Sequence, residues 1–424
     1  MRLTDFMRVW LTRSFEPFRF RCEHAERLAF EHLDDLGLYV HIPFCRSLCS
    51  FCPYCKVEYE RETAARYKTA LLGEIDLAGR QLGSKKEAAS LYFGGGTPAL
   101  MIDDLGDIID KLRKYFIISG GVGIELHPND INRVNLDKLK AAGVTMVSVG
   151  IQSFNRLCLG KLGRYGEGYA QKVRSVAEAG FDVVDVDLIF AIPGQTDEML
   201  IHDVDTAFSL GATQVSTYPF IDFTFADNRY RPLPEKDKKR MLKVLVDHCR
   251  SAGKDRTSVW TFAELGTERY SSVTRDNFLG FGASAATLLR DSFKMNTFSI
   301  EGYIERVDSE QLPTSLTLNF TKRQRASYFL FWNAYLMSIS PDKFETTVGA
   351  PLSKLFGLEI WILERLGLLY RENGQYRLTD RAAYWYHNIE QAYTTAYIDK
   401  MWNICRKTAF PEEIDLYSCA DSCV

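Results

Sequence analysis

Three cysteines, Cys45, Cys49 and Cys52, lie four and then three residues apart in one short stretch of the chain. The residues before them, 38 to 44, form a short apolar run that contains Pro43. Proline cannot donate a hydrogen bond within a central strand, so the run predicts a strand that ends there. We therefore expect the cysteines on the loop that leaves the carboxyl end of a strand. Thiolates packed this closely select an iron–sulfur cluster or zinc.

Zinc or a pair of disulfides is the alternative explanation of these cysteines, with Cys55 as the fourth. A structural zinc site usually takes a second pair of ligands at a distance along the chain. Ten cysteines in 424 residues do not make a disulfide scaffold, and four of them lie within eleven residues. The pattern favours a metal site and a reducing compartment. With three ligands, one iron of a four-iron cluster stays free to bind a substrate or cofactor.

Composition excludes some classes of partner. The net charge is −3, so the chain has no overall basic excess for a nucleic-acid backbone. No uncharged apolar stretch reaches the roughly 18 residues of a membrane span, and the first residues lack the apolar run of a signal peptide. We expect a cytoplasmic protein. Aromatic residues make up 13% of the chain, which suits a pocket for a flat or conjugated substrate.

Predicted strands and helices alternate with short connections from residue 37 to residue 220. The six predicted strands cover residues 38–42, 88–93, 123–127, 144–151, 183–190 and 213–218. This alternation is typical of parallel β/α units. Six units cannot close an eight-stranded barrel, so we predict an α/β fold with a partial (β/α)6 barrel and its chemistry at the carboxyl ends of the strands.

We predict five segments along the chain. They are an N-terminal extension (1–36) with a helical-looking stretch at 23–33, the partial barrel (37–220), a barrel extension on the substrate side (221–320), a C-terminal domain (321–405) and a tail (406–424). Two helices, a short hairpin and a final helix are expected in the C-terminal domain. The tail contains Cys419 and Cys423, which could bind a second metal or belong to an unstructured end.

The CxxxCxxC spacing after a strand resembles the radical S-adenosylmethionine (SAM) superfamily. The longer string YVHIPFCRSLCSFC, residues 39–52, resembles its HemN-like branch, the oxygen-independent coproporphyrinogen dehydrogenases and their relatives. The resemblance implies that Cys45, Cys49 and Cys52 hold a [4Fe–4S] cluster whose open iron binds SAM. It also implies reductive cleavage of SAM to a 5′-deoxyadenosyl radical, an electron donor such as flavodoxin or ferredoxin, and a winged-helix-like C-terminal domain that serves as a substrate lid.

The resemblance further implies SAM-binding residues at the other strand ends. They are Tyr39, Gly94, Gly95, Gly96, Thr97, Glu125, Gln152, Arg164 and Asp187. Glycines let the backbone approach a ligand closely and expose N–H donors. The family places the glycine run at the amino group of SAM, Gln152 and Asp187 at its ribose, and Arg164 at its carboxylate. Without the family, Glu125 would be read as a solvated strand end and Arg164 as a surface charge.

Candidate residues for the substrate side lie beyond the predicted barrel. Trp260 and Tyr270 are candidate aromatic walls, and Arg275 is a candidate anion clamp. It is equally consistent with the sequence that the two aromatic residues are ordinary core residues and that the arginine lies on the surface. Tyr39 and Arg275 are the candidate catalytic residues, the first because it resembles the family tyrosine beside the cluster-bound SAM.

The motifs leave the reaction open. We place radical methyl transfer or anaerobic modification of haem or another tetrapyrrole first. The alternatives are a radical lyase on a modified nucleoside, such as release of queuine from queuosine, oxidative decarboxylation of coproporphyrinogen III, and a non-catalytic haem chaperone. Relatives usually carry Gly-Leu-Pro where this chain has Ala191-Ile192-Pro193, and together with the loop of residues 52–55 this disfavours coproporphyrinogen as the substrate.

Overall fold

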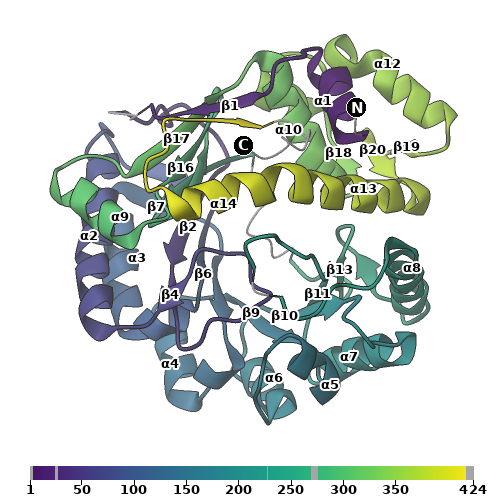
Figure 1. Ribbon diagram of the computed structural model, residues 1–424, viewed down its shortest axis with the longest axis horizontal. Helices are drawn as coiled ribbons and strands as arrows, with labels where there is room; N and C mark the ends of the chain where they lie inside the picture. Colours follow the sequence, from purple (N-terminus) through teal and green to yellow (C-terminus); the bar gives the residue numbers. More distant parts are fainter. Residues whose placement is uncertain (1–2, 24–26, 227, 269–275, 417–424) are drawn as a thin grey trace.

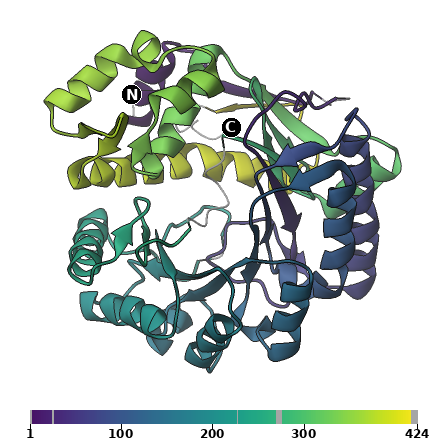
Figure 2. The ribbon, with the colours of Figure 1, turned by 180° about the vertical axis from the view of Figure 1, so that it is seen from behind.

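The computed structural model describes residues 3–23, 27–226, 228–268 and 276–416, and one sheet runs through most of it (Figure 1). In the described residues this sheet has fourteen strands, in the order β12-β13-β11-β10-β9-β8-β6-β2-β14-β15-β16-β17-β1-β21. The sheet bends into an open barrel in the middle of the molecule, and helices cover its outer face (Figures 1 and 2).

Six neighbouring strands of this sheet form the barrel. They are β2 (Leu36–Ile42), β6 (Ser90–Gly95), β8 (Val122–Leu126), β9 (Met146–Gln152), β10 (Val183–Phe190) and β11 (Gln214–Pro219). Each pairs in parallel with the next. Most of their residues are buried, as expected of parallel strands covered on both faces. The outermost strands, β2 and β11, pair with β14 and β13 rather than with each other, so the predicted partial barrel is confirmed.

Helices connect the barrel strands and pack outside them. They are α2 (Arg61–Gly79), η1 (Pro98–Asp104), α3 (Leu105–Tyr115), η2 (Pro128–Asp130), α4 (Arg133–Ala141), α5 (Arg156–Lys161), α6 (Tyr169–Glu178), α7 (Asp197–Ser209) and α8 (Glu235–Ser251). Asn132 and Thr196 cap α4 and α7 by accepting backbone N–H bonds, which satisfies donors that a helix start otherwise leaves unpaired. Two short strands, β5 (Lys86–Ala88) and β7 (Phe116–Ile118), pair outside the barrel.

The sheet continues beyond both edges of the barrel. The added strands are β1 (Phe18–Arg21), β12 (Asp255–Arg256), β13 (Thr261–Ala263), β14 (Asn277–Phe281), β15 (Ala286–Leu288), β16 (Ser292–Asn296), β17 (Thr314–Asn319) and β21 (Glu413–Leu416), with α9 (Ile300–Asp308) between β16 and β17. Strand β1 lies between β17 and β21, so the two ends of the described chain are neighbours. One sheet thus takes strands from four of the five predicted segments.

The C-terminal region packs as a separate layer above the open side of the barrel. Its elements are α10 (Lys322–Tyr335), β18 (Ser338–Ile339), α11 (Pro341–Val348), α12 (Leu352–Arg365), β19 (Leu369–Glu372), β20 (Gln375–Leu378), α13 (Asp380–Tyr393), η3 (Thr394–Ile398) and α14 (Asp399–Lys407). Strands β18, β20 and β19 form a small sheet. The first helix, α1 (Leu3–Thr12), packs on α10 and α13. Helices α13 and α14, joined by η3, cross the barrel opening (Figures 1 and 2).

The expected helix at 23–33 is wrong for the described residues 27–33, which form irregular backbone with one turn. Phe30 is fully buried in the main core and packs on Phe116, and the backbone N–H of Leu28 donates to the Gln81 side chain at 2.8 Å. Contacts of Leu28 and Phe30 with the barrel therefore override the helical periodicity of the segment. No helix within the described ranges is long and apolar enough to cross a membrane.

Candidate functional site

A cavity of about 940 Å³ lies between the carboxyl ends of the barrel strands and helix α13. Two groups of side chains line it. The barrel half contains the cysteine loop, the barrel-strand residues Tyr39, Glu125, Gln152 and Asp187, and Arg164 of the loop after α5. The aromatic chamber contains Tyr54, Tyr218, Trp260, Tyr335, Tyr386, Glu390 and Tyr393. The cavity is continuous, so a molecule bound at the strand ends would lie beside a molecule in the chamber.

The cysteine loop leaves the carboxyl end of β2 after Pro43, as predicted. Strands β3 (Phe44–Cys45) and β4 (Val57–Glu58) pair and close the loop at its base. Inside it, the Lys56 ammonium donates to the backbone carbonyls of Cys49 and Cys52, both at 2.7 Å. The Thr97 hydroxyl lies 3.7 Å from the Cys45 sulfur. These contacts hold a compact loop whose three thiols, on Cys45, Cys49 and Cys52, all line the cavity.

The three thiols can ligate the irons of a [4Fe–4S] cluster. In a [4Fe–4S] cluster each thiolate binds a different iron, so its ligands stand further apart than those of a zinc ion. Burial raises the pKa of the Cys45 thiol to about 11 and also raises that of Cys49. Thiolates at these positions therefore need a positive group such as iron beside them.

The glycine run at the end of β6 packs against the chain that leaves β2. Gly95 has a φ of +123°, and a Cβ on Gly96 would lie 2.6 Å from the Phe44 carbonyl oxygen. The N–H groups of Gly96 and Thr97 donate to the carbonyls of Ile42 and Phe44, both at 2.7 Å. These two donors are therefore used within the chain and are not free for a ligand. The glycines are needed here at least as much to seat the cysteine loop against β6 as to approach a cofactor.

Two half-buried carboxyl groups, of Glu125 and Asp187, line the barrel half and interact electrostatically. Glu125 accepts from the Tyr92 hydroxyl at 2.9 Å and from the Gly95 N–H at 3.2 Å. Asp187 accepts from the Ser148 hydroxyl at 2.6 Å. Burial, and then the charge of Asp187, raises the pKa of Glu125 to about 7, and burial raises the pKa of Asp187 to about 6. The pair would be stabilised by a cationic ligand.

Gln152 and Arg164 complete the barrel half from β9 and the loop after α5. Gln152 has a φ of +72°, which is strained for a residue with a side chain, and it lies where the β9–β10 register shifts. Arg164 is only 7% exposed, so it is not a surface charge. Its Nε has no hydrogen-bond partner in the described part of the chain, which leaves a donor available for an anionic group.

Tyr39 is fixed through a histidine that the sequence analysis did not single out. The Tyr39 hydroxyl lies 2.9 Å from His41 Nδ1, and His41 Nε2 lies 3.0 Å from the Cys55 carbonyl oxygen. Burial lowers the pKa of His41 to about 4, so the ring is neutral. A carbonyl can only accept, so Nε2 carries the proton and Nδ1 accepts from Tyr39. This chain of bonds ties Tyr39 to the cysteine loop.

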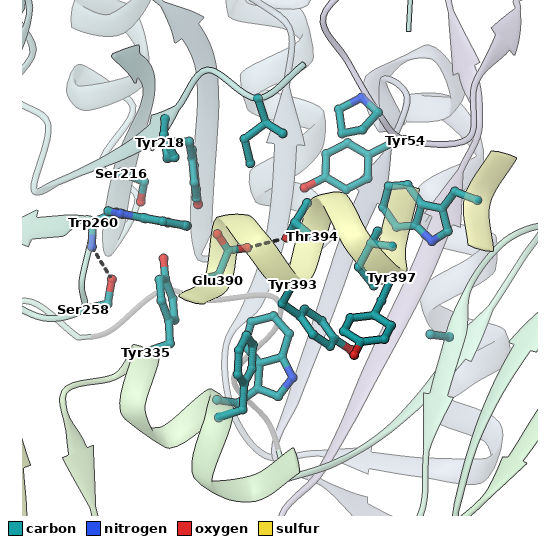
Figure 3. Close-up of a pocket in the computed structure, with 18 of the residues that line it drawn as sticks. Tyr54, Ser216, Tyr218, Ser258, Trp260, Tyr335, Glu390, Tyr393, Thr394 and Tyr397 are labelled. Atoms are coloured by element: carbon teal, nitrogen blue, oxygen red, sulfur yellow. Dashed lines mark hydrogen bonds between the residues drawn. The ribbon is translucent and has the colours of Figure 1, made fainter. Parts of the chain in front are cut away.

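The side chains of the aromatic chamber point toward a common space (Figure 3). Trp260, 5% exposed, has its ring 6.2 Å from that of Tyr218 and 5.6 Å from that of Tyr335, measured between centroids. The Trp260 indole N–H donates to His387 at 3.0 Å. Tyr54 and Tyr218 expose 51% and 40% of their surface although both line the cavity. That exposed area faces the interior and is available to a ligand.

Some predicted residues are not part of this arrangement. Tyr270, Arg275, Cys419 and Cys423 lie outside the described residues, so their roles stay predictions. Cys55 is buried, and its thiol contacts the Phe298 carbonyl at 3.5 Å. Most residues of the chamber carry no sequence motif. The density of aromatic residues between 384 and 397 was the available signal, but no pattern in the sequence distinguishes Glu390 from other helical glutamates.

Comparison with known proteins agrees with this geometry. Residues 39–207 match the model of the radical SAM superfamily. The heme chaperone HemW of Bacillus subtilis is 26% identical over 361 residues, which cover 80% of this chain and 94% of that protein. The oxygen-independent coproporphyrinogen III oxidase of Pseudomonas aeruginosa is 27% identical, with 80% of each chain covered. These matches support a place for this chain in the HemN-like branch of the radical SAM superfamily.

A solved structure has the same overall fold. The structure of coproporphyrinogen III oxidase (HemN) from Escherichia coli superimposes with a TM-score of 0.71 at 22% identity, over 84% of this chain and 88% of that one. Radical SAM proteins bind a [4Fe–4S] cluster and SAM, and these are the cofactors of this HemN-like protein. The donor set of the barrel half fits both of them.

Proposed function

We propose that this HemN-like protein is an enzyme that cleaves SAM reductively and directs the resulting radical at a planar conjugated substrate. The observation that carries the proposal is the single cavity that joins the cysteine loop and the strand-end carboxylates to the aromatic chamber. At about 940 Å³ the cavity lies near the upper end of the range for small-molecule sites, which leaves room for SAM and a second molecule.

In this proposal the residues of the barrel half hold the cofactors. Cys45, Cys49 and Cys52 ligate the cluster, which when bound supplies the electron that splits SAM into methionine and a 5′-deoxyadenosyl radical. Glu125 accepts hydrogen bonds from the cationic part of SAM. The unpaired Nε of Arg164 donates to its carboxylate.

The remaining predicted SAM residues orient the cofactor. Gln152 and Asp187, at the ends of β9 and β10, reach its ribose. Gly94, Gly95, Gly96 and Thr97 line the approach beside the cysteine loop, and Tyr39 is held next to the cluster through His41. Helix α13 lies over the opening and limits the access of water. A radical intermediate requires such shielding from water.

Radical methyl transfer or anaerobic modification of a tetrapyrrole is the reaction we place first. The aromatic side chains of the chamber provide flat apolar walls for such a ring. Lyase action on a modified nucleoside and decarboxylation of coproporphyrinogen III use the same first step and differ only in the substrate. An electron donor of the flavodoxin or ferredoxin type would reduce the cluster.

A haem chaperone is the second candidate function. It is favoured by HemW relatives that carry the name heme chaperone and align along 80% of this chain. A chaperone would bind haem stoichiometrically in the same cavity without turnover. The two functions therefore differ in products and not in the expected position of the ligand.

Anaerobic reconstitution with iron and sulfide, followed by SAM and reductant, tests the proposal. We expect about four irons per chain and formation of 5′-deoxyadenosine. S-adenosylhomocysteine formed in parallel selects methyl transfer, whereas 5′-deoxyadenosine alone with a tetrapyrrole or nucleoside selects the other reactions. A haem Soret band that survives desalting, together with intact SAM, would show that the protein is a haem chaperone and not an enzyme. Zinc in the purified protein would contradict both.

A further inference from the structure

Glu390 has a buried carboxylate oxygen without a partner. Its Oε1 accepts from the Thr394 hydroxyl at 2.7 Å, but Oε2 is shielded from solvent and has no hydrogen bond among the described residues. The hydroxyl of Tyr386, one helical turn earlier on α13, also has no partner there, and Tyr386 is buried. Unpaired polar atoms are rare in protein interiors, and two on one face of a helix beside a cavity indicate a ligand that pairs with them.

The surroundings of Glu390 are aromatic (Figure 3). The carboxylate lies between Trp260 and Tyr335 on one side and Tyr393 and Tyr397 on the other. Directly after Tyr393, and one turn after Glu390, the helix changes to the π-helical segment η3. Such a distortion is often found at functional sites. Aromatic faces attract cations, and aromatic walls stack on flat rings. Together with a carboxylate they recognise a flat group that carries positive charge or N–H donors.

The basic residues of the cavity are engaged away from the chamber. Arg8 donates to backbone carbonyls of residues 14–16, Arg46 pairs with Asp130 at 3.1 Å, and Lys56 donates to the carbonyls of Cys49 and Cys52. Arg164 belongs to the barrel half. In the part of the chain that the structure describes, the chamber therefore has no cation of its own to receive an anionic substrate.

Burial raises the pKa of Glu390 to about 7. Lys238 of α8, behind the chamber, opposes this shift through its charge. It donates to Glu235 at 2.7 Å and to Gln391 at 2.6 Å, and it does not line the cavity. A second buried carboxyl group, Asp185 of β10, does line the cavity and accepts from the Ser216 hydroxyl. The described surface of the chamber is thus acidic as well as aromatic.

We propose that the aromatic chamber binds a flat nitrogen heterocycle, which presents an N–H or ammonium donor to Glu390. This inference rests on the proposed function, because it names the substrate class of the same cavity. A ring that entered with a carboxylate towards Glu390 would bring like charges together, which is unfavourable in a desolvated site. Among the reactions considered above, the inference favours a substrate with a nucleobase-like edge over one that enters with its propionates.

Two fluorescent three-ring probes of similar shape test this charge preference. They are 9-aminoacridine, a cation with N–H donors at neutral pH, and anthracene-9-carboxylate, an anion. The full chain is reconstituted with its cluster and saturated with SAM without reductant, so that the barrel half is filled. We expect the wild-type protein to bind the aminoacridine at least about tenfold more tightly than the carboxylate, as for other charge-assisted hydrogen bonds.

The deciding variant is Glu390→Gln, which keeps the shape and removes the charge. We expect it to reduce the preference for the aminoacridine by about tenfold and to leave SAM affinity unchanged. Glu345→Gln, the same change at an exposed position of α11, is the matched control and should keep the wild-type preference. A wild-type protein that binds both probes equally, or a Glu390→Gln protein that keeps the preference, would overturn the inference.

The outcome is separable from that of the proposed function. The probe titration contains no reductant and does not require cleavage of SAM. If the wild type forms no 5′-deoxyadenosine but the charge preference is lost in Glu390→Gln, the proposed enzymatic function is refuted and the chamber assignment stands. A protein that forms 5′-deoxyadenosine with an unchanged preference would refute only the chamber assignment.

Discussion

The two halves of the cavity differ in how their residues are arranged. The barrel half is built from strand ends and from one loop in which the three cysteines lie within eight residues. Apart from Tyr54 of the cysteine loop, the aromatic chamber is built from α10, α13, β11 and the residue before β13, which lie far apart in the chain. Motifs identify the first half because its chemistry is the same throughout the superfamily. The second half has no motif, and it is where a substrate would be distinguished.

This comparison predicts that changes in the barrel half affect cleavage of SAM with any substrate, whereas changes in the chamber affect only the binding of the substrate.

The largest effect is expected for Cys49→Ala. Loss of one of three thiolates removes the cluster or leaves it unable to bind SAM, so formation of 5′-deoxyadenosine should fall about a thousandfold or more. Iron content and product yield after anaerobic reconstitution measure it. A variant with full iron and near-normal cleavage would show that Cys49 is not a ligand.

The next effect is expected for Glu125→Gln, which keeps the shape and removes the charge. A charge-assisted hydrogen bond contributes about 1.5–3 kcal/mol, so the dissociation constant of SAM should rise roughly 10- to 100-fold. Equilibrium binding of SAM without reductant measures it. Glu390→Gln serves as the comparison in the other half and should bind SAM as the wild type does. Equal weakening in both variants would remove the distinction between the halves.

A smaller effect is expected from pH. The pKa of Glu125 is raised to about 7 by burial and by Asp187, and that of Asp187 is raised to about 6 by burial. Cationic SAM favours the ionised forms, so binding releases protons, and affinity should rise with pH by about tenfold between pH 6 and pH 7 and then level off. The same titration on Glu125→Gln should give a shallower rise. An affinity that is flat across this range would contradict the assignment.

The smallest effect is expected for Cys55→Ser. Its thiol is buried against the Phe298 carbonyl, and Cys55 lies outside the CxxxCxxC motif. Serine is smaller and more polar, so unfolding stability should fall by about 1 kcal/mol while iron content and cleavage change less than about twofold. Thermal unfolding and iron analysis of the same preparation measure both. Loss of the cluster in Cys55→Ser but not in Cys52→Ser would exchange the roles of these two cysteines.

The sequence alone predicted the partial barrel and the end of it at which the candidate site residues meet. Alternating strands and helices require parallel pairing, and parallel strands bring their carboxyl ends to one edge, so Cys45, Glu125 and Asp187 had to lie near each other. Local patterns of this kind depend on neighbours in the chain, and they can be read without coordinates. Even there, the strained backbone of Gln152 and the bond from Tyr39 to His41 were not predictable from the motif.

Only the tertiary structure decided what faces the strand ends. Glu390 meets the barrel because α13 crosses its opening, and that placement depends on packing between α1, α10 and α13 rather than on any local pattern. The pairing of β1 with β21, residues 18–21 with 413–416, is likewise a contact between distant segments. Such contacts are selected by burial of apolar surface over the whole chain, which no short stretch of sequence encodes. For this reason the cofactors could be predicted from the sequence, whereas the walls of the substrate chamber could not.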